Sequence, residues 1–376
     1  MLEGGEWCWD EASCATRAAT QGPLLSNKLW KQSVAMGGIF ETNEAKTPFA
    51  GAHKVYVPYC SSDAWVGDTE AFGLQFRGQA IVGAVLKAMV QQLRMGASGA
   101  DRLLFGGCSA GARGAMFSLD YVGGMLSEAG AAPGAISVRG LLDSPLWIDV
   151  APLAKSPLSL QCQTQAALGF LNATNRLGSR CAAAYQGPEA WRCLFGQYRL
   201  PMLETPYGLN ADQFDTFQLE YNLGGTMPPR YANQYAYADS FGAATLAVVS
   251  SLPAAGQVDS GVFSPACFHH CVTLTEGFWG IQAEGITFSD AVRWWFFGGC
   301  PQEDCPNGLP TQVIEHCDEG YQRCKSKCTL KHSTKGGKHK PRAPKTFTWS
   351  PGMATPPPPL VPLACDAGPQ PQVLQS

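Results

Sequence analysis

The sequence predicts an α/β fold in which a mostly parallel β-sheet carries helices on both faces. Short apolar or β-branched runs, Leu103–Phe105 and Ile136–Leu142, alternate with segments of helical spacing such as Gly78–Met95. This order is typical of parallel strands joined by helical crossovers. Ser109 and Asp143 follow the two runs. Because such sheets bind ligands at the carboxyl ends of their strands, we expect the functional site there.

The elements before residue 100 are predicted from turn residues and apolar spacing. Residues 1–14 fit the end of a strand, a Gly-Gly turn and a small disulfide loop, and Lys54–Pro58 fits a short strand. Gly78–Met95 has the single apolar face of a helix that packs on a sheet. That face consists of Ile81, Val85, Ala88, Met89 and Leu93.

The elements after residue 100 build the rest of the sheet. The strand Leu103–Phe105 turns at two glycines into a helix that we expect to continue to about Glu128. Residues 150–200 are rich in Gln, Ala and Cys and are predicted to form a helical insertion over the cleft. Met202–Leu209 is predicted to be a further strand.

Composition divides the 376 residues into a globular domain, residues 1–328, and a basic, Pro-rich tail, residues 329–376. The tail cannot fill a core, so we expect it to be disordered. Residues 325–345 carry eight Lys or Arg and no acidic residue, so a total charge of −3 leaves the remainder at about −11. The lack of aromatic residues among these basic ones, and of a recognised nucleic-acid-binding fold, argues against nucleic-acid binding.

Fifteen cysteines predict a disulfide-bonded protein from an oxidising compartment. No Cys-x2-Cys pair occurs, so we expect no structural zinc site. The odd count leaves at least one thiol unpaired, and Cys108 is our candidate for it. No apolar run reaches the roughly 18 residues of a membrane span, and the opening residues Met1–Cys8 do not form a signal peptide.

The strongest catalytic motif is Gly107-Cys108-Ser109-Ala110-Gly111. In a Gly-x-Ser-x-Gly elbow of an α/β-hydrolase-like fold, the serine sits on a strained strand-to-helix turn that projects its hydroxyl into a cleft. The following helix points its positive end at a developing oxyanion. Ser109 is therefore the predicted nucleophile. Cys108 is a weaker candidate because it lies one residue from the apex of the elbow.

A serine nucleophile needs a base and an orienting carboxylate. His269 and His270 are the histidines that follow Ser109 outside the cationic C-terminal region, as the chain order Ser, acid, His requires. The oxyanion donors are expected to be the Ala110 amide and an amide of the Gly4-Gly5 turn. Spacing alone leaves the acid open among Asp143, Asp149, Asp212 and Asp215.

Six sequence blocks in order resemble the family of serine carboxylesterases that contains the plant pectin acetylesterases and the animal protein Notum. Together they extend from residue 2 to about residue 300, so the resemblance covers most of the predicted domain. The blocks are Leu2–Cys8, Val57–Trp65, Gly107–Gly111, Arg139–Ser144, Trp191–Gly196 and Cys267–His270.

The resemblance implies a role for each open candidate. It matches the family nucleophile to Ser109, the acid to Asp215 and the base to His270, because the family base lies three residues after a cysteine. Asp143 becomes structural. The implied oxyanion donors are the backbone groups of Gly5, Glu6 and Ala110.

Further implications concern the N-terminal region. A carboxylate at Glu6 would oppose a developing negative charge unless it turns outward to solvent. The family also has a small disulfide loop that matches Cys8 and Cys14. Its members carry strands and a signal peptide before the Leu2–Cys8 block, so the resemblance implies that this chain lacks them.

On this resemblance, the favoured interpretation is a secreted enzyme, extracellular or in the cell wall, that deacetylates a pectin-like polysaccharide without metal or cofactor. The alternative is Notum-like removal of a fatty acyl group from a protein, which would need a deeper apolar pocket. The substrate is then an acylated polysaccharide or an acylated protein, and the oligomeric state stays open. A hypothesis of another class is an inactive glycan-binding or scaffold protein on the same fold. Candidate pocket-lining residues are Trp147, Leu194 and Phe195.

Overall fold

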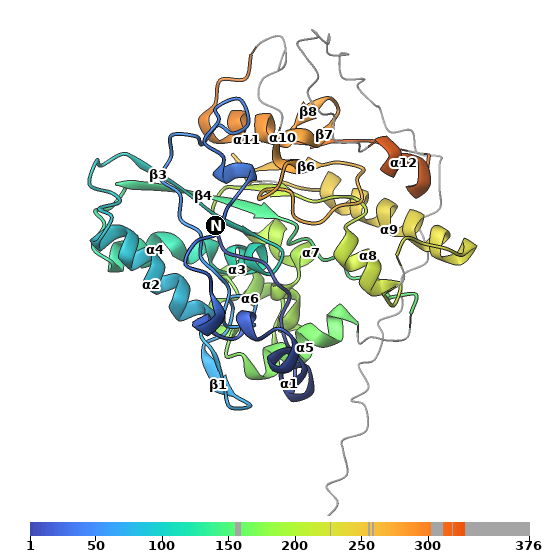
Figure 1. Ribbon diagram of the computed structural model, residues 1–376, viewed down its shortest axis with the longest axis horizontal. Coiled ribbons are helices and arrows are strands. Elements are labelled where there is room, and N and C mark those ends of the chain that lie inside the picture. The colour runs from blue at the N-terminus through green and yellow to red at the C-terminus, as the bar shows by residue number, and fades with distance from the viewer. Residues whose placement is uncertain are drawn as a thin grey trace, which may run out of the picture.

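The computed structural model describes residues 1–154, 159–225, 227–254, 256–257, 259–301, 311–317 and 319–327. The predicted tail, residues 329–376, and the predicted domain end at Cys328 lie outside these residues. Within the described part, a twisted central sheet is flanked by helices above and below (Figure 1).

The central sheet has five parallel strands in the order β3-β4-β5-β6-β9. β3 and β4 pair along their whole length, from Asp101 opposite Ile136 to Cys108 opposite Asp143. The predicted parallel sheet is thus confirmed, and its longest strands end where Ser109 and Asp143 were expected to meet. The strands are β3 (Asp101–Cys108), β4 (Ile136–Asp143), β5 (Tyr207–Asn210), β6 (Gly261–Ser264) and β9 (Gln312–Ile314).

The N-terminal segment runs beside β3. Leu2 forms isolated parallel bridges to Gly107 and Val57, and its amide donates a 2.7 Å hydrogen bond to the Gly106 carbonyl. The strand predicted at Lys54–Pro58 is therefore reduced to a single bridge. As a result, the Gly4-Gly5 turn leaves the sheet beside the carboxyl end of β3.

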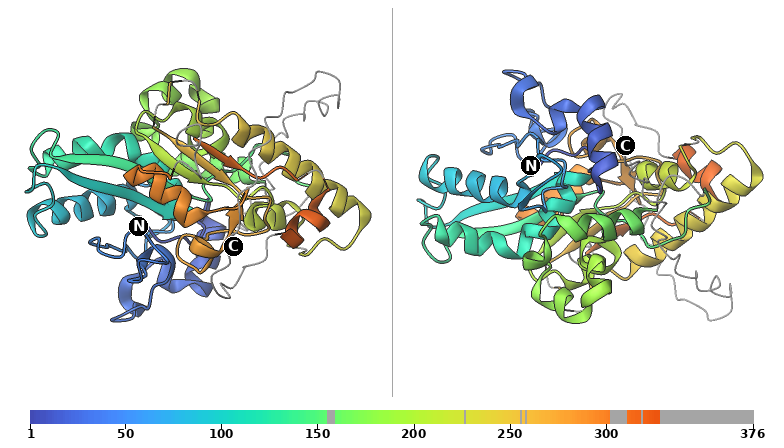
Figure 2. Two further views of the ribbon diagram at one scale, coloured as in Figure 1. Left: turned by 90° about the horizontal axis from the view of Figure 1, so that it is seen from above. Right: turned by 90° about the horizontal axis from the view of Figure 1, so that it is seen from below.

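Side chains alternate between two cores, because successive residues of a strand point to opposite faces of a sheet. In β4, Leu141 joins the smaller core and Leu142 the larger one. In the view from above, α11 lies across the sheet (Figure 2). In the view from below, other helices cover the opposite face of the sheet (Figure 2). The larger core is covered by α2 (Gly78–Gln91), α3 (Ala110–Ser118), α4 (Val122–Glu128) and α9 (Ala232–Ser250), and the smaller by α10 (Gly277–Gly280) and α11 (Phe288–Phe297).

Several elements are shorter than predicted. The helix expected over Gly78–Met95 ends at Gln91, and the helix after the elbow is interrupted by a 3₁₀ turn at Leu119–Tyr121. In the region predicted as the strand Met202–Leu209, residues 200–202 form a 3₁₀ turn and β5 begins only at Tyr207. Prolines at 201 and 206 account for this, since proline cannot donate to a strand ladder.

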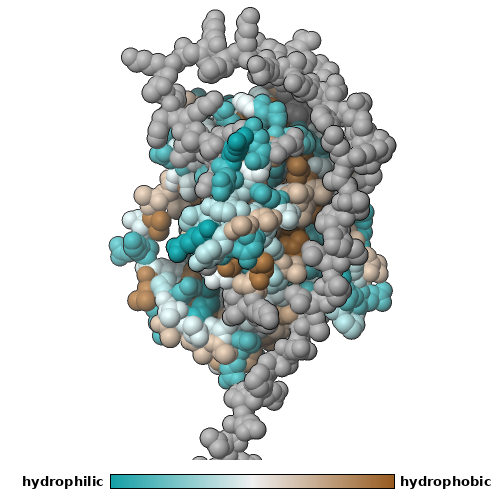
Figure 3. Space-filling view, turned by 90° about the vertical axis from the view of Figure 1, so that its right-hand side faces the viewer, coloured by the Kyte–Doolittle hydropathy of each residue, from teal (hydrophilic) through white to brown (hydrophobic). Residues whose placement is uncertain are grey.

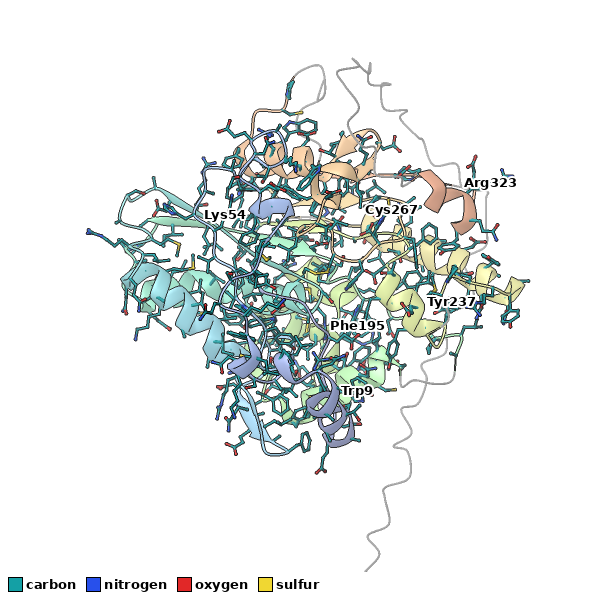
Figure 4. All side chains as sticks on the ribbon, viewed as in Figure 1. Trp9, Lys54, Phe195, Tyr237, Cys267 and Arg323 are labelled. Carbon is teal, nitrogen blue, oxygen red and sulfur yellow. A yellow bond between two sulfur atoms is a disulfide. The ribbon has the colours of Figure 1, made fainter. Side chains whose placement is uncertain are left out.

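Residues 150–200 contain the predicted helical insertion, which packs on the larger core. Trp191 is fully buried there, and Cys181–Cys193 ties two of its turns together. Phe195 lies in the interior of the molecule, whereas Trp9 lies close to the helix α1 (Figure 4). The elements of the insertion are α5 (Leu160–Phe170), α6 (Ser179–Ala184), a 3₁₀ helix (Gly187–Leu194) and α7 (Gly196–Arg199).

The remaining described elements surround this framework. They include three helices and two small hairpins, and the surface on the α9 and α12 side mixes hydrophilic with hydrophobic residues (Figure 3). None of the described helices is long and apolar enough to span a bilayer. These elements are α1 (Glu11–Thr20), α8 (Thr216–Asn222), α12 (Tyr321–Lys327), β1 (Thr69–Ala71) with β2 (Leu74–Phe76), and β7 (Gln282–Ala283) with β8 (Ile286–Thr287).

Disulfides staple the described structure, as the cysteine content predicted. The expected Cys8–Cys14 pair is present. The prediction that Cys108 is unpaired is wrong, because the end of β3 meets the loop after β6 and Cys108 bonds to Cys271. Within the described residues, the free cysteine is Cys60. A further pair joins Cys317 to Cys324.

Candidate active site

Ser109 occupies a strained elbow between β3 and α3. Its φ of 54° and ψ of −121° lie outside the regions that L-residues favour, a strain that folded proteins keep mainly at functional sites. The Ser109 amide donates to the Asp143 carbonyl at 2.9 Å. At Gly107 a Cβ atom would lie 2.4 Å from the backbone carbon of Gly111, so the close turn requires glycine. The motif thus forms the predicted strand-to-helix corner.

His270 and Asp215 form a hydrogen-bonded pair. The Nδ1 atom of His270 lies 2.6 Å from Oδ2 of Asp215, and their side chains are 17% and 10% exposed. The other Asp215 oxygen accepts the Gln218 amide at 2.9 Å and so caps the N-terminus of α8. The imidazole also stacks on Phe217, with ring centroids 5.5 Å apart. A proton held on Nδ1 by Asp215 leaves Nε2, which is buried and has no hydrogen-bond partner among the described residues, as the basic nitrogen.

A disulfide joins Cys108, the residue before Ser109, to Cys271, the residue after His270. The Cα atoms of Cys108 and Cys271 are 5.5 Å apart, and the Cys271 amide donates to the Ser144 hydroxyl at 3.1 Å. This bond holds the loop that carries His270 against the elbow that carries Ser109. It also leaves Cys108 without the thiol that a cysteine nucleophile would need.

Within the described residues, none of the other candidate acids hydrogen-bonds to His270. Asp143 is fully buried and accepts hydrogen bonds from the Asn210 amide group at 2.8 Å and the Thr273 backbone amide at 2.7 Å. It therefore ties β4 to β5 and to the loop behind His270. Asp149 accepts a 2.6 Å hydrogen bond from the Tyr198 hydroxyl. Asp212 is buried, and its burial together with the charges of Asp143 and Asp215 raises its pKa well above the ordinary value.

The surroundings of His270 set its protonation. Burial opposes the charged form, but the charge and hydrogen bond of Asp215, followed by the charges of Asp143 and Asp212, outweigh burial and raise the pKa of His270 above 6.5. His269 differs, because burial lowers its pKa. The pKa values of the two adjacent histidines are thus shifted in opposite directions.

A pH profile should report this shift. A general base must be neutral, so kcat/KM for an ester is expected to be constant at high pH and to fall as pH drops through the raised pKa of His270. The acid limb should therefore lie above pH 6.5. The measurement is p-nitrophenyl acetate hydrolysis from pH 5 to 9, with Ser109→Ala subtracted as the background. An acid limb at or below the ordinary histidine value would contradict the prediction.

The Gly4-Gly5 turn packs directly against the elbow. A Cβ atom on Gly4 would lie 3.1 Å from the Ser109 Cβ and 2.8 Å from the Cys108 carbonyl oxygen. The amides of Gly5 and Glu6 donate to no acceptor within the described chain. The Ala110 amide lies in the first turn of α3, where helical N–H groups lack intrahelical partners.

Glu6 adopts a left-handed backbone, and its side chain points away from the interior. Its φ is 59°, its side chain is 54% exposed, and its carboxylate lies 3.9 Å from an Arg17 nitrogen. The side chain is thus turned to solvent, which is the orientation that the resemblance required of it. The neighbouring cation also offsets part of its charge.

The candidate pocket residues lie in the core. Trp147, Leu194 and Phe195 are 4%, 3% and 1% exposed. Trp147 stacks on Phe217 with centroids 6.0 Å apart, and its edge meets Phe195 at 5.6 Å. These contacts connect Trp147 and Phe195 to the Phe217 ring, which supports His270.

Sequence reasoning missed the role of Arg113. Its guanidinium lies between the rings of Trp7 and Trp147, 4.0 Å and 3.6 Å from their centroids. Burial lowers the pKa of Arg113 to about 9, so it still carries its charge at neutral pH. The signal in the sequence was a bulky cation four residues after Ser109, on the same side of α3 one turn later.

Two clusters of described side chains have metal-like spacing. They are Cys108, Asp143 and Cys271, and Asp212, Cys267 and His269, with ligand atoms within 4.8 Å of one another. Every cysteine in them is disulfide-bonded, and a disulfide sulfur is not the thiolate that binds metals. At most two ligands therefore remain in either cluster.

A family model described as Pectinacetylesterase matches residues 1–328. Palmitoleoyl-protein carboxylesterase NOTUM of Mus musculus is 28% identical over 341 residues, 87% of this chain and 65% of that protein. Palmitoleoyl-protein carboxylesterase notum1 of Xenopus laevis is 31% identical over 304 residues, 78% of this chain and 60% of that protein. The chain thus spans slightly less than two thirds of the length of these curated relatives.

A solved structure of the Wnt deacylase Notum from Drosophila is also similar. It has a TM-score of 0.74 and 26% sequence identity, and the match covers 87% of this chain and 89% of that one. A second crystal form gives a TM-score of 0.71 at 27% identity. These matches confirm the predicted α/β-hydrolase-like architecture.

Proposed function

The chain belongs to the pectinacetylesterase family, which contains carboxylic ester hydrolases, and from this premise we propose that it is a serine carboxylesterase. The observation that carries the proposal is the 2.6 Å bond between His270 and Asp215, held by a disulfide beside the strained Ser109. We take residues 1–328, which the family model matches, as the esterase domain.

The proposed reaction proceeds through an acyl-enzyme. Ser109 Oγ attacks the ester carbonyl while His270 Nε2 takes its proton, and Asp215 stabilises the imidazolium. The amides of Gly5, Glu6 and Ala110 stabilise the oxyanion of the tetrahedral intermediate. This intermediate collapses when His270 protonates the leaving alcohol. A water molecule, deprotonated by His270, then attacks the acyl-enzyme and releases the carboxylic acid with free Ser109.

We propose that the acyl group is short, and that acetyl groups of a pectin-like polysaccharide are the substrate. Trp147 and Phe195 close the space behind Phe217 by ring contacts. Arg113 places a buried charge between Trp7 and Trp147. A fatty acyl chain would have to separate these side chains and pack against the guanidinium, which is costly for a buried charge.

Removal of a fatty acyl group from a protein is the second candidate. It is supported by the curated relatives, which are named palmitoleoyl-protein carboxylesterases. For either substrate we propose a secreted, extracellular protein, because the described disulfides fit an oxidising compartment.

Chain-length selectivity separates the two candidates. For p-nitrophenyl esters of two to sixteen carbons, kcat/KM is expected to be highest for acetate and to fall steeply beyond butyrate, because a longer chain would have to separate the packed rings of Trp147, Phe195 and Phe217. Acetate release from acetylated pectin and deacylation of a palmitoleoylated peptide are measured in parallel. A preference for long chains would support the Notum-like function. Absence of turnover on every ester would support the inactive glycan-binding interpretation.

A further inference from the structure

The Gly5–Glu6 peptide group has a charged partner on its carbonyl side. Nη2 of Arg17 donates a hydrogen bond to the Gly5 carbonyl oxygen. The Glu6 amide, a proposed oxyanion donor, belongs to the same peptide group. In a trans peptide the C=O and N–H bonds point in opposite directions, so a contact that fixes the carbonyl also aims the amide.

We propose that Arg17 is a positioning residue that orients and polarises the Gly5–Glu6 peptide for oxyanion binding. The inference rests on the proposed esterase function. Arg17 would not touch the substrate and would act through the Glu6 amide. A hydrogen bond from a cation to a carbonyl is stronger than one from a neutral donor. It also draws electron density from the peptide group and so makes the N–H a better donor.

The fold keeps Arg17 in place for this contact. Arg17 is only 5% exposed and lies in α1, and the Cys8–Cys14 disulfide returns that helix to the loop that contains Glu6. Its other two nitrogens also donate: Nε to the Ser62 hydroxyl and Nη1 to the Gln21 side-chain carbonyl, both at 2.6 Å.

The groups that accept hydrogen bonds from Arg17 in these three contacts are all neutral. The carboxylate of Glu6 is 3.9 Å from Nη1, and its side chain is exposed. A buried cation with a single distant carboxylate is costly for stability, and burial lowers the pKa of Arg17. A neutral side chain could fill a purely structural role without the free-energy cost of burying a charge. A role in stabilising negative charge on the other side of the peptide gives the buried cation a function.

The next peptide group is held in a similar way. The Tyr59 hydroxyl donates to the Glu6 carbonyl at 3.0 Å, and burial raises the pKa of Tyr59 well above its ordinary value, so the hydroxyl stays protonated. Glu6 has a positive φ of 59°, which is strained for a residue with a Cβ atom, whereas Gly5 adopts its φ of 140° without that cost. Such strain persists only where the surroundings over-determine it, and Arg17 and Tyr59 provide that constraint from two sides.

The test compares Arg17→Met with Gln21→Ala in the full chain. Arg17→Met removes the bond to the Gly5 carbonyl, whereas Gln21→Ala removes only the acceptor of Nη1. With p-nitrophenyl acetate we expect Arg17→Met to lower kcat by roughly 10- to 100-fold with KM little changed, since misplacing an oxyanion donor costs transition-state binding. Gln21→Ala should keep the wild-type kcat, and Arg17→Lys should recover part of the loss because it retains a cationic donor.

Comparison with a thionoester identifies the oxyanion hole as the cause. Sulfur accepts hydrogen bonds poorly, so the p-nitrophenyl thionoacetate rate depends little on these donors, and Arg17→Met should lower the ester-to-thionoester rate ratio. Equal losses on both substrates, or a loss matched by Gln21→Ala, would overturn the proposal. If Arg17→Met does not fold, as judged by Tm, the same ratio is measured on Arg17→Lys, and an unchanged ratio overturns it. Wild type is first compared with Ser109→Ala, so failure of the esterase function itself is seen separately and would remove the premise.

Discussion

Replacing Ser109 by alanine is expected to reduce turnover of p-nitrophenyl acetate about a million-fold, which is the usual cost of removing the nucleophile of a working triad. The reason is covalent: without Oγ no acyl-enzyme forms, and only the oxyanion donors remain to assist direct attack by water. Binding should survive, because the lost hydroxyl is a small part of the site. The measurement is kcat and KM for both proteins, with a mass-spectrometric search for an acylated Ser109 in the wild type.

The matched control is Ser127→Ala. Ser127 is exposed on α4, and its hydroxyl donates to the Gly123 carbonyl of its own helix. Ser127→Ala should therefore retain full activity, and both variants should keep the wild-type Tm. Equal activity of wild type and Ser109→Ala would exclude the elbow serine as the nucleophile. Inactivity of all three folded proteins would favour a binding protein on this fold.

Replacing His270 by alanine is expected to cost about as much as replacing Ser109, since the two act as a unit. His270 is the histidine that contacts Asp215, at 2.6 Å, and stacks on Phe217. Without it Ser109 has no base to accept its proton, and the leaving alcohol has no acid. The same p-nitrophenyl acetate assay measures the loss, and the Ser109→Ala/His270→Ala double variant should be no worse than either single variant.

The adjacent His269 is the control for this prediction. The His269 contact relevant to the site is made by its backbone carbonyl, which accepts the Thr216 amide at 3.1 Å and which alanine retains. His269→Ala should thus remain active. The assignment of the base would be reversed if His269→Ala were inactive while His270→Ala retained activity.

Much of the framework could be predicted from local sequence patterns. Alternating apolar runs and helical spacing predicted a parallel sheet, and β3 and β4 contain the expected strands. The motif around Ser109 predicted the strand-to-helix turn of the backbone there, because Gly-x-Ser-x-Gly specifies a local turn. The choice of Asp215 and His270 needed the family resemblance, since four aspartates and two histidines satisfied the chain order equally well.

The features that the sequence did not reveal depend on contacts between distant segments. Cys108 was the candidate for the unpaired thiol because the cysteine count is odd and it lies beside Ser109, yet the sheet brings Cys271 to it across 163 residues. Arg113 interacts with aromatic rings from two other parts of the chain. Arg17 reaches Gly5 only because α1 folds back. Spacing cannot identify partners that tertiary packing selects.

The Cys108–Cys271 bond has a consequence for when the molecule becomes competent during its biogenesis. Closing a loop of this length is entropically costly, so before oxidation the flanking segments must find each other by folding alone, and afterwards the covalent link keeps them together. Oxidative maturation would therefore complete the juxtaposition of Ser109 and His270. A newly made chain in a reducing compartment would contain Ser109, His270 and Asp215 but not the disulfide that holds their loops together. Full hydrolytic activity would then be reached only where thiols are oxidised.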